Sequence, residues 1–270
     1  MARNILVTGS SHGIGAACAI AFARDEGANI GICGNKSAAG AQEVAKQCEA
    51  YGVKTKIYLG EVGNHDWCKA TMEDFIATFG KIDVLINNAG GALQIPGGPK
   101  GEFKDMPMEY WDSQIALNLN SAAYLSRYAV ADMVEKKTEG RNVNVSSIHG
   151  QVTWVHRRML PYSAGKGGLN MFTKALGVEV AKYGIRVNAV APGLIFTKAI
   201  ERYSEADLVS FAHKIPVGRG GTTDEVVPMI QFLADIEKAR FIVGQVICVD
   251  GGQSSDGSIE SMNFPLASME

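Results

Sequence analysis

The chain has 270 residues, of which 46% are hydrophobic and 20% charged, and its formal net charge is −2. These values are typical of a globular protein, and the weak charge argues against nucleic-acid or membrane-surface partners. No apolar run approaches the ~20 residues that span a bilayer, and the amino-terminal segment lacks a signal-peptide pattern. The five cysteines are scattered without a C-x-x-C pair. We therefore expect a cytoplasmic protein with reduced thiols and without a metal site.

Short β-branched runs alternate with longer segments at helical spacing. In chain order we expect strand 4–9, helix 13–26, strand 28–33, helix 38–50, strand 53–60, helix 66–79, strand 82–90, helix 109–136, strand 141–147, helix 161–183, strand 185–193, helix 223–235 and strand 244–252. Continuously apolar strands that alternate with helices indicate a parallel sheet covered on both faces. The predicted fold class is α/β, a Rossmann-like doubly wound sheet of about seven strands.

The expected domain organisation is one domain over residues 1–252, because no linker or repeat divides the chain. Two segments fall outside the alternation of strands and helices: residues 90–107 and an arm from 194 to about 221. Long loops at such places usually carry specificity, so we expect the arm to contact substrate. The tail 253–270 follows the last predicted strand, and its order is left open.

A glycine-rich turn, TGSSHGIG over Thr8–Gly15, leads from the first strand into a helix. Gly9 would permit the tight turn, Gly13 a close approach of backbone to a pyrophosphate, and Gly15 close helix–sheet packing. Phosphates would then lie at the positive end of the helix. The spacing is not G-x-G-x-x-G, and a glycine-rich turn without a ligand is the alternative.

A tyrosine and a lysine lie four residues apart in PYSAGKGGLN, at Tyr162 and Lys166. On a helix they would share one face, one turn apart. The composition makes such a pair expected by chance roughly half of the time, so it indicates nothing by itself. Its significance depends on the other motifs.

Six short motifs occur together in one order: TGSSHGIG, NNAG (87–90), NVSS (144–147), YSAGK (162–166), APG (191–193) and VDGG (249–252). In order and spacing the chain resembles the short-chain dehydrogenase/reductases, over essentially its whole length to about residue 252. The resemblance implies an NAD(P)-dependent oxidoreductase that acts on a secondary alcohol or a carbonyl. It also implies a homo-oligomer, a tetramer or dimer, paired through the long helices.

The resemblance makes Tyr162 the catalytic acid or base. A free tyrosine, with a pKa of ~10, is a poor base near neutrality. The Lys166 ammonium and the positive charge of oxidised nicotinamide would favour the phenolate and lower that pKa. In the family the lysine also bonds the nicotinamide ribose.

The resemblance assigns two further catalytic positions. Ser147 matches the serine that holds the substrate oxygen; Ser146 is the rival, but strand alternation would point the two serines to opposite faces. Asn118 matches the asparagine that helps to hold a water in a proton relay to Lys166. A structural amide that bends the helix is the alternative role for Asn118, and Asn120 is the alternative residue.

The segment after the second strand predicts the cofactor. Enzymes that use NAD usually place a carboxylate there to bind the adenosine ribose. This chain has Gly34 at that position, followed by Asn35, Lys36 and Ser37, and His12 lies in the glycine loop. We therefore expect NADP(H) to be preferred over NAD(H), with a solvated Lys36 as the alternative.

The expected cofactor contacts come from all the motifs. Glu61-Val62 replaces the usual Asp-Val pair near the adenine, which makes that contact less certain. The complete predicted set is Gly9, Ser11, His12, Gly13, Ile14, Gly15, Asn35, Lys36, Ser37, Glu61, Val62, Asn88, Ala89, Gly90, Tyr162, Lys166, Pro192, Gly193, Ile195 and Thr197.

The substrate pocket is harder to predict. Candidate residues are Leu93, Gln94, His149, Gln151 and Trp154. The run SSIHGQVTW, followed by YSAGKGG, is similar to bacterial glucose and related sugar dehydrogenases, which favours a sugar, a polyol or another small cyclic carbonyl. A 3-oxoacyl thioester carried on acyl carrier protein is the second candidate. A non-catalytic NADP(H)-binding sensor is the alternative of another class, and the intact set of catalytic residues argues against it.

Overall fold

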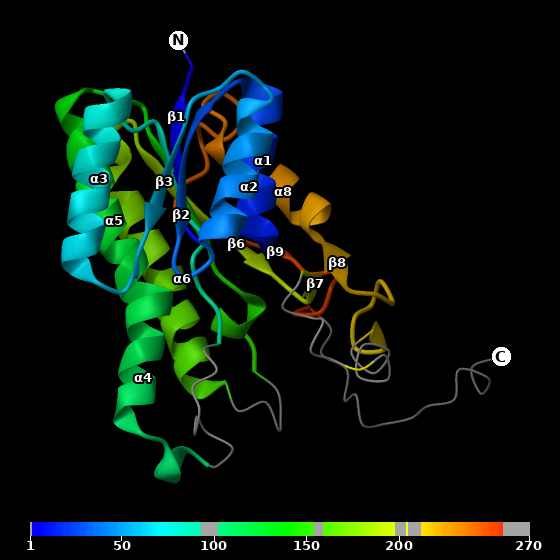
Figure 1. Cartoon of the computed structure of the whole chain (residues 1–270). Helices are drawn as coiled ribbons and strands as arrows, with labels where there is room; N and C mark the ends of the chain where they lie inside the picture. The colour runs from blue at the N-terminus through cyan, green and yellow to red at the C-terminus, as the bar shows by residue number, and fades with distance from the viewer. Residues whose placement is uncertain (1, 93–101, 154–158, 198–203, 205–211, 256–270) are drawn as a thin grey trace.

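The computed structural model describes residues 2–92, 102–153, 159–197, 204 and 212–255 (Figure 1). Seven parallel strands form one sheet in the order β3-β2-β1-β4-β5-β6-β9. They are β1 (Asn4–Val7), β2 (Asn29–Gly34), β3 (Thr55–Leu59), β4 (Val84–Asn87), β5 (Arg141–Val145), β6 (Arg186–Pro192) and β9 (Val246–Val249). The predicted doubly wound sheet is confirmed. The chain reverses its winding direction between β1 and β4, and this creates a crevice at the carboxyl ends of the strands.

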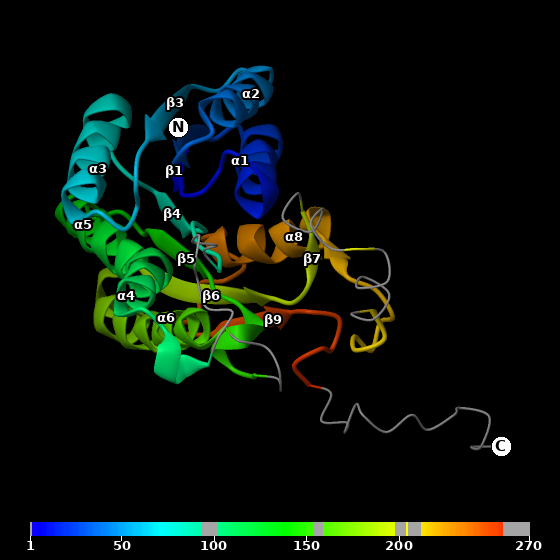
Figure 2. The same ribbon diagram turned by 60° about the horizontal axis from the view of Figure 1, so that its bottom comes forward.

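Helices cover both faces of the sheet. The long ones are α1 (Gly13–Glu26), α2 (Ala38–Glu49), α3 (His65–Phe79), α4 (Met108–Ile115), α5 (Ser121–Glu135), α6 (Leu160–Val180) and α8 (Thr223–Ala234). Short turns are η1 (Phe103–Asp105), η3 (Ile148–Gly150) and η4 (Ala181–Tyr183). Figure 2 shows α1, α2 and α8 on one side of the sheet and α3, α5 and α6 on the other.

The strand sequences explain this three-layer arrangement. In β1, Ile5 and Val7 belong to the core cluster beneath α1, α2 and α8, whereas Leu6 belongs to the cluster beneath α3 and α5. In β4, Ile86 belongs to the first of these clusters and Leu85 to the second. Both faces of these strands are apolar because both are buried, as in other parallel sheets.

The long helix predicted over 109–136 is interrupted, which corrects that prediction. A π segment, η2 (Ala116–Asn120), separates α4 from α5. The hydrophobic pattern continues across it, so the widened turn leaves no trace in the spacing of apolar residues. Such π turns are often found at functional sites.

The ends of the predicted arm are held together. A short parallel pair joins β7 (Ile195–Phe196) to β8 (Gly221–Thr222), with Ile195 opposite Gly221. The chain therefore leaves the carboxyl end of β6 and later returns beside the same point. Directly after β8, Thr222 and Glu225 form a capping box that starts α8.

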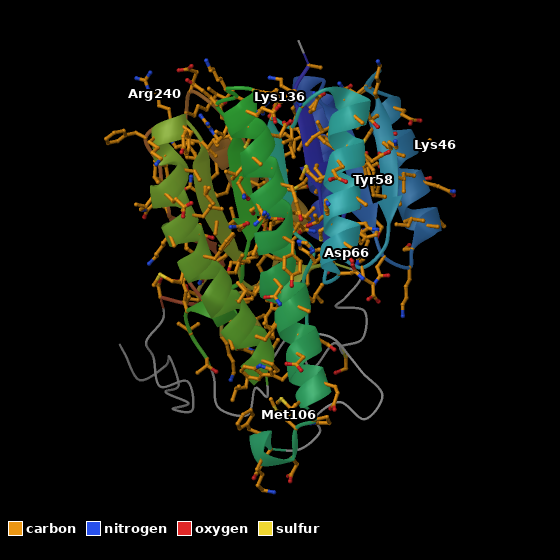
Figure 3. All side chains as sticks on the ribbon, turned by 90° about the vertical axis from the view of Figure 1, so that its left-hand side faces the viewer. Lys46, Tyr58, Asp66, Met106, Lys136 and Arg240 are labelled. Carbon is orange, nitrogen blue, oxygen red and sulfur yellow. The ribbon has the colours of Figure 1, made fainter. Side chains whose placement is uncertain are left out.

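The end of the molecule that carries α4 lies opposite the end that carries Lys136 and Arg240. Figure 3 shows Met106, just before α4, far from these two residues along the length of α5 and α6. In the described part of the chain, no helix has the length and apolarity needed to cross a membrane. Within the same residues, no three His, Cys, Asp or Glu side chains gather as a metal site would require.

Candidate active site

A cavity of about 1020 Å³ opens at the carboxyl ends of the central strands. It runs from the end of β2, across the glycine loop, to the start of α6 and the segment after β9. Its described lining is Gly9, Ser11, His12, Gly13, Ile14, Cys33, Gly34, Asn35, Gly60, Glu61, Val62, Gly63, Asn64, Asn88, Ala89, Gly90, Gly91, Ala92, Ser113, Ala116, Leu117, Val145, Ser146, Ser147, Ile148, His149, Met159, Tyr162, Lys166, Pro192, Gly193, Leu194, Ile195, Thr197, Lys214 and Gln253. Most of the predicted cofactor residues are among them.

The glycine loop has the backbone that its sequence predicts. Gly9 and Gly13 adopt φ of 62° and 60°, in the left-handed region that favours glycine. A Cβ on Gly15 would lie 2.4 Å from Asn88 Nδ2 and 2.5 Å from the Gly9 carbonyl oxygen. Gly15 therefore stays outside the cavity lining but allows the start of α1 to pack against the loop after β4.

The loop after β4 is tied to the end of β1. The Thr8 hydroxyl oxygen accepts hydrogen bonds from the backbone N–H groups of Asn88 and Ala89, each at 2.9 Å. The Asn88 side chain donates to the Thr8 carbonyl oxygen at 2.8 Å. These bonds fix the loop that carries Asn88, Ala89 and Gly90 beside the glycine loop, at one wall of the cavity.

The residues after β2 divide into two groups. Asn35 lines the cavity together with Gly34, against which Ser11 lies. Lys36 and Ser37 are exposed and lie outside the described lining, and Ser37 Oγ accepts from the Gly40 N–H as the cap of α2. The structure therefore brings Asn35, but not Lys36 or Ser37, to the cavity.

The cavity lining also contains the predicted residues His12, Glu61 and Val62. His12 is exposed at the cap position of α1, where its Nδ1 lies 3.1 Å from Ser11 Oγ. At the other wall lie Pro192, Gly193, Ile195 and Thr197. Pro192 ends β6, Gly193 follows it, Ile195 begins β7 and Thr197 follows β7.

Lys166 is buried beneath Tyr162 on α6. Its side chain is 3% exposed, and its Nζ donates to the Val145 carbonyl oxygen at 2.8 Å. The same nitrogen lies 5.9 Å from the centroid of the Tyr162 ring. Burial lowers the pKa of Lys166 to about 8, because the charged ammonium is removed from water.

Two influences act in opposite directions on the pKa of Tyr162. Burial is the largest influence and raises the pKa of the Tyr162 phenol, while a hydrogen bond with Ser147 opposes that rise. In the protein alone, burial therefore outweighs the hydrogen bond. That Lys166 and oxidised nicotinamide together lower this pKa stays a prediction for the cofactor-bound protein.

The two serines after β5 face different surroundings. Ser146 Oγ donates to Asn170 Oδ1 at 2.5 Å, within the protein interior. Ser147 hydrogen-bonds Tyr162, and its Oγ also accepts from the His149 N–H at 3.2 Å. Both serines border the cavity, but only Ser147 acts on the pKa of Tyr162. This arrangement favours Ser147 over its rival for the substrate oxygen.

Asn118 lies in the π segment and is 1% exposed. Its Nδ2 donates to the carbonyl oxygens of Gly91 and Gln114, and its Oδ1 accepts from the Gly91 N–H at 2.9 Å. A Cβ on Gly90 would lie 2.9 Å from Asn118 Oδ1 and 2.8 Å from Lys166 Nζ. The amide thus joins the π segment to Gly91, which is a structural role. Its oxygen also lies next to Gly90, as does the Lys166 ammonium. Asn120 is not part of the described lining.

Only one predicted substrate residue borders the cavity in the described chain. The His149 ring meets the Tyr162 ring edge to face, with centroids 5.9 Å apart. Gln151 is exposed outside the described lining, and its Nε2 lies 3.3 Å from Cys248 Sγ. Leu93, Gln94 and Trp154 lie outside the described residues.

Several residues that the sequence motifs do not predict also line the cavity. Gln253 follows the VDGG motif directly, and its Oε1 accepts from the Leu194 N–H at 3.3 Å. Lys214, Met159 and Ser113 also border the cavity. No local pattern marks these four residues, because distant segments bring them to the site.

Comparisons with known proteins agree with this geometry. A family model described as Enoyl-(Acyl carrier protein) reductase matches residues 9–254. The uncharacterized oxidoreductase YohF of Escherichia coli (strain K12) is 33% identical over 253 residues, which cover 93% of this chain and 96% of that protein. The 3-oxoacyl-[acyl-carrier-protein] reductase FabG of Thermotoga maritima is 36% identical over 250 residues, with coverage of 92% and 96%.

Solved structures show the same architecture. The crystal structure of acetoin dehydrogenase YohF from Salmonella typhimurium matches with a TM-score of 0.84 and 31% identity, covering 96% of this chain and 98% of that one. The family model, the relatives and the shared fold together agree with the motif resemblance. The chain belongs to the short-chain dehydrogenase/reductase family and is an oxidoreductase.

Proposed function

We propose that this protein is an NADP(H)-preferring enzyme that interconverts a secondary alcohol and a carbonyl. One observation carries the proposal. Ser147, Tyr162 and Lys166 converge at one end of a cavity whose other end is formed by the glycine loop. A dinucleotide bound along the cavity would bring its nicotinamide to a hydroxyl pair that can bind an oxygen and exchange a proton.

The residues present fit a dinucleotide. Gly9 and Gly13 leave the start of α1 uncovered, where its N–H groups and helix dipole suit a pyrophosphate. Gly90 keeps the space before Lys166 clear, since a Cβ there would lie 2.8 Å from the lysine Nζ. When bound, the nicotinamide supplies or accepts the hydride. Lys166 and Tyr162 would hold the adjoining ribose.

Tyr162 would hold the proton that is exchanged with the substrate oxygen. Because burial raises its pKa, the phenol stays protonated at neutral pH, which suits proton donation during carbonyl reduction. Ser147 would bind the same oxygen beside it. With a pKa of about 8, Lys166 is still mostly cationic at pH 7 and would stabilise the phenolate that remains after transfer.

Asn118 would support resupply of the proton. Its Oδ1 and Lys166 Nζ both approach the same face of Gly90, within reach of one bridging water. The hydrogen bonds of its amide with Gly91 would keep that opening in place.

The preference for NADP(H) rests on the end of β2. Residues 34–37 contain no carboxylate to bind a ribose or repel a 2′-phosphate. Ser11, His12 and Asn35 border the cavity at that end. Placing a carboxylate there with Gly34→Asp is expected to lower kcat/KM for NADPH relative to NADH by at least about tenfold. A wild-type enzyme that strongly favours NADH would contradict the preference.

For the substrate we propose a sugar, a polyol or another small cyclic carbonyl. A relative named for acetoin supports a small carbonyl substrate more generally. A 3-oxoacyl thioester is the second candidate, supported by the relative named as a 3-oxoacyl-[acyl-carrier-protein] reductase. NADPH and NADH consumption over a panel of sugars, small ketones, steroids and 3-oxoacyl thioesters, with the reverse reaction on the alcohols, separates these candidates. No turnover, with intact NADPH binding, would favour the sensor.

Tyr162→Phe tests the mechanism directly. We expect loss of about 10²- to 10⁴-fold in kcat with little change in cofactor affinity, because the hydroxyl that exchanges the proton is removed while Lys166 and the glycine loop remain to hold the cofactor. The matched control is Tyr183→Phe, since Tyr183 is 48% exposed on η4, away from the cavity lining. Near-normal kcat in Tyr162→Phe would rule out the assigned role.

We also propose a homo-oligomer paired through α6. Met171 and Val178 are seven residues apart, on one face of the helix, and remain 65% and 75% exposed. Light scattering after size exclusion tests this, and Val178→Glu is expected to reduce the assembly size. A monomeric wild-type protein would contradict the proposal.

A further inference from the structure

Beneath the substrate end of the cavity, Asn170 connects three parts of the chain. Its Oδ1 accepts from Ser146 Oγ at 2.5 Å, and its Nδ2 donates to the Gly150 carbonyl oxygen at 3.2 Å. Asn170 is 8% exposed, and Ser146 is 4% exposed. Asn170 follows Lys166 by one turn of α6, so both side chains lie on the same side of the helix.

The turn η3 packs directly on α6 at this point. A Cβ on Gly150 would lie 2.7 Å from Asn170 Nδ2 and 2.8 Å from the Lys166 carbonyl oxygen. Glycine at position 150 therefore permits the contact, and the asparagine amide completes it with a hydrogen bond. Within the turn, the Gly150 N–H donates to the Ser147 carbonyl oxygen at 2.9 Å.

The same short turn carries two groups that face Tyr162. Ser147 hydrogen-bonds the tyrosine, and the His149 ring lies edge to face against the tyrosine ring. The position of both groups relative to Tyr162 thus depends on how firmly the turn is held to α6. Asn170 supplies a side-chain bond across that junction without bordering the cavity itself.

We propose that Asn170 is a positioning residue that sets carbonyl-substrate affinity by holding residues 147–150 against Tyr162. The inference rests on the proposed function for the identity of the substrate. The donor side of the amide carries the effect, because it holds Gly150, whereas the acceptor side bonds Ser146 at the end of β5. Leucine would remove both bonds. Aspartate would keep the acceptor, but its carboxylate would face the Gly150 carbonyl oxygen.

The test compares Asn170→Leu, Asn170→Asp and Ser146→Ala with the wild type. We expect both Asn170 variants to raise KM for the carbonyl about tenfold or more, with the KM for NADPH changed less than twofold. Losing a buried hydrogen bond and leaving its partner unpaired is enough for a change of this size. Ser146→Ala keeps the bond to Gly150, so its carbonyl KM should change less than threefold.

Thr173→Val is the matched control. Thr173 is also buried on α6 and hydrogen-bonded, with its hydroxyl oxygen accepting from Asn144 Nδ2 at 2.9 Å, but it does not bond η3. We expect this variant to have a lower free energy of unfolding. The ratio of its KM for the carbonyl to its KM for NADPH should stay at the wild-type value. A carbonyl KM that stays at the wild-type value in Asn170→Leu, or that rises only in step with the NADPH KM, would overturn the proposal.

Hydrogen–deuterium exchange gives a readout that needs no turnover. Amides of residues 147–153 should exchange faster in Asn170→Leu than in the wild type, and Thr173→Val should leave them unchanged. Unaltered exchange in Asn170→Leu would overturn the positioning role. A wild-type protein that reduces no carbonyl would instead contradict the proposed function, and the exchange result would still decide the role of Asn170.

Discussion

Replacing Lys166 with methionine should make the protein more stable at neutral pH while abolishing turnover. The ammonium is 3% exposed, and it donates a hydrogen bond to a neutral acceptor, the Val145 carbonyl oxygen. Burying a charge without an opposite charge is costly. We expect Lys166 to be retained for chemistry at the expense of stability.

The pKa of Lys166 gives the magnitude. Burial lowers it from 10.5 to about 8, which corresponds to roughly 3 kcal/mol at 1.36 kcal/mol per pKa unit. The folded chain loses this proton at lower pH than the unfolded chain. Between about pH 8 and pH 10.5 the unfolded state therefore binds more protons, and the free energy of unfolding rises with pH. The destabilisation is fully present below pH 8 and disappears near pH 10.5.

Urea denaturation from pH 7 to pH 10.5 measures this effect. The stability advantage of Lys166→Met over the wild type should shrink by roughly 3 kcal/mol across that range. Lys174→Met is the control, because Lys174 is exposed on the same helix, and its difference from the wild type should be constant. A constant difference for Lys166→Met would refute the reasoning, since it would mean that the lysine has the same pKa in both states.

Two further substitutions test the packing described above. Gly15→Ala should raise the Kd for NADPH about tenfold, because its Cβ would lie within 2.5 Å of Asn88 Nδ2 and the Gly9 carbonyl oxygen, and unchanged NADPH binding by fluorescence titration would contradict this. Arg141 is 2% exposed and donates to backbone carbonyl oxygens that include those of Gly140 and Ile236. Arg141→Met should therefore reduce the free energy of unfolding by about 3 kcal/mol, whereas the exposed Arg240→Met should leave it nearly unchanged. Equal urea midpoints for the two arginine variants would show that the buried bonds contribute little.

Most of the sheet could be predicted from the sequence because its strands are buried on both faces. A run such as Ile5, Leu6 and Val7 has apolar side chains on both sides, which distinguishes it from the amphipathic helices. The glycine loop was also predictable, because a left-handed φ at Gly9 and Gly13 restricts the residue type.

The remaining features depend on contacts between distant segments. The π turn around Asn118 is stabilised by bonds to Gly91, which is 27 residues away in sequence. Gln253 reaches the cavity because the segment after β9 folds against Leu194. Ser37 is predicted to contact the cofactor, and in the structure it caps α2; both roles suit a serine after a strand. Local pattern cannot distinguish such alternatives.

The π turn between α4 and α5 also determines which side of α4 faces the cavity. The α5 half is locked in register, because Leu125 and Ala129 are fully buried in the core. On the other side of the turn, Ser113 of α4 borders the cavity, as does Leu117 within the turn. Each residue of a helix advances by about 100°. Because a π turn holds about one residue more than an α turn, rewinding 116–120 as regular α-helix with no residue removed would rotate α4 by about that angle. That rotation would replace one wall of the cavity without altering any residue beside Tyr162.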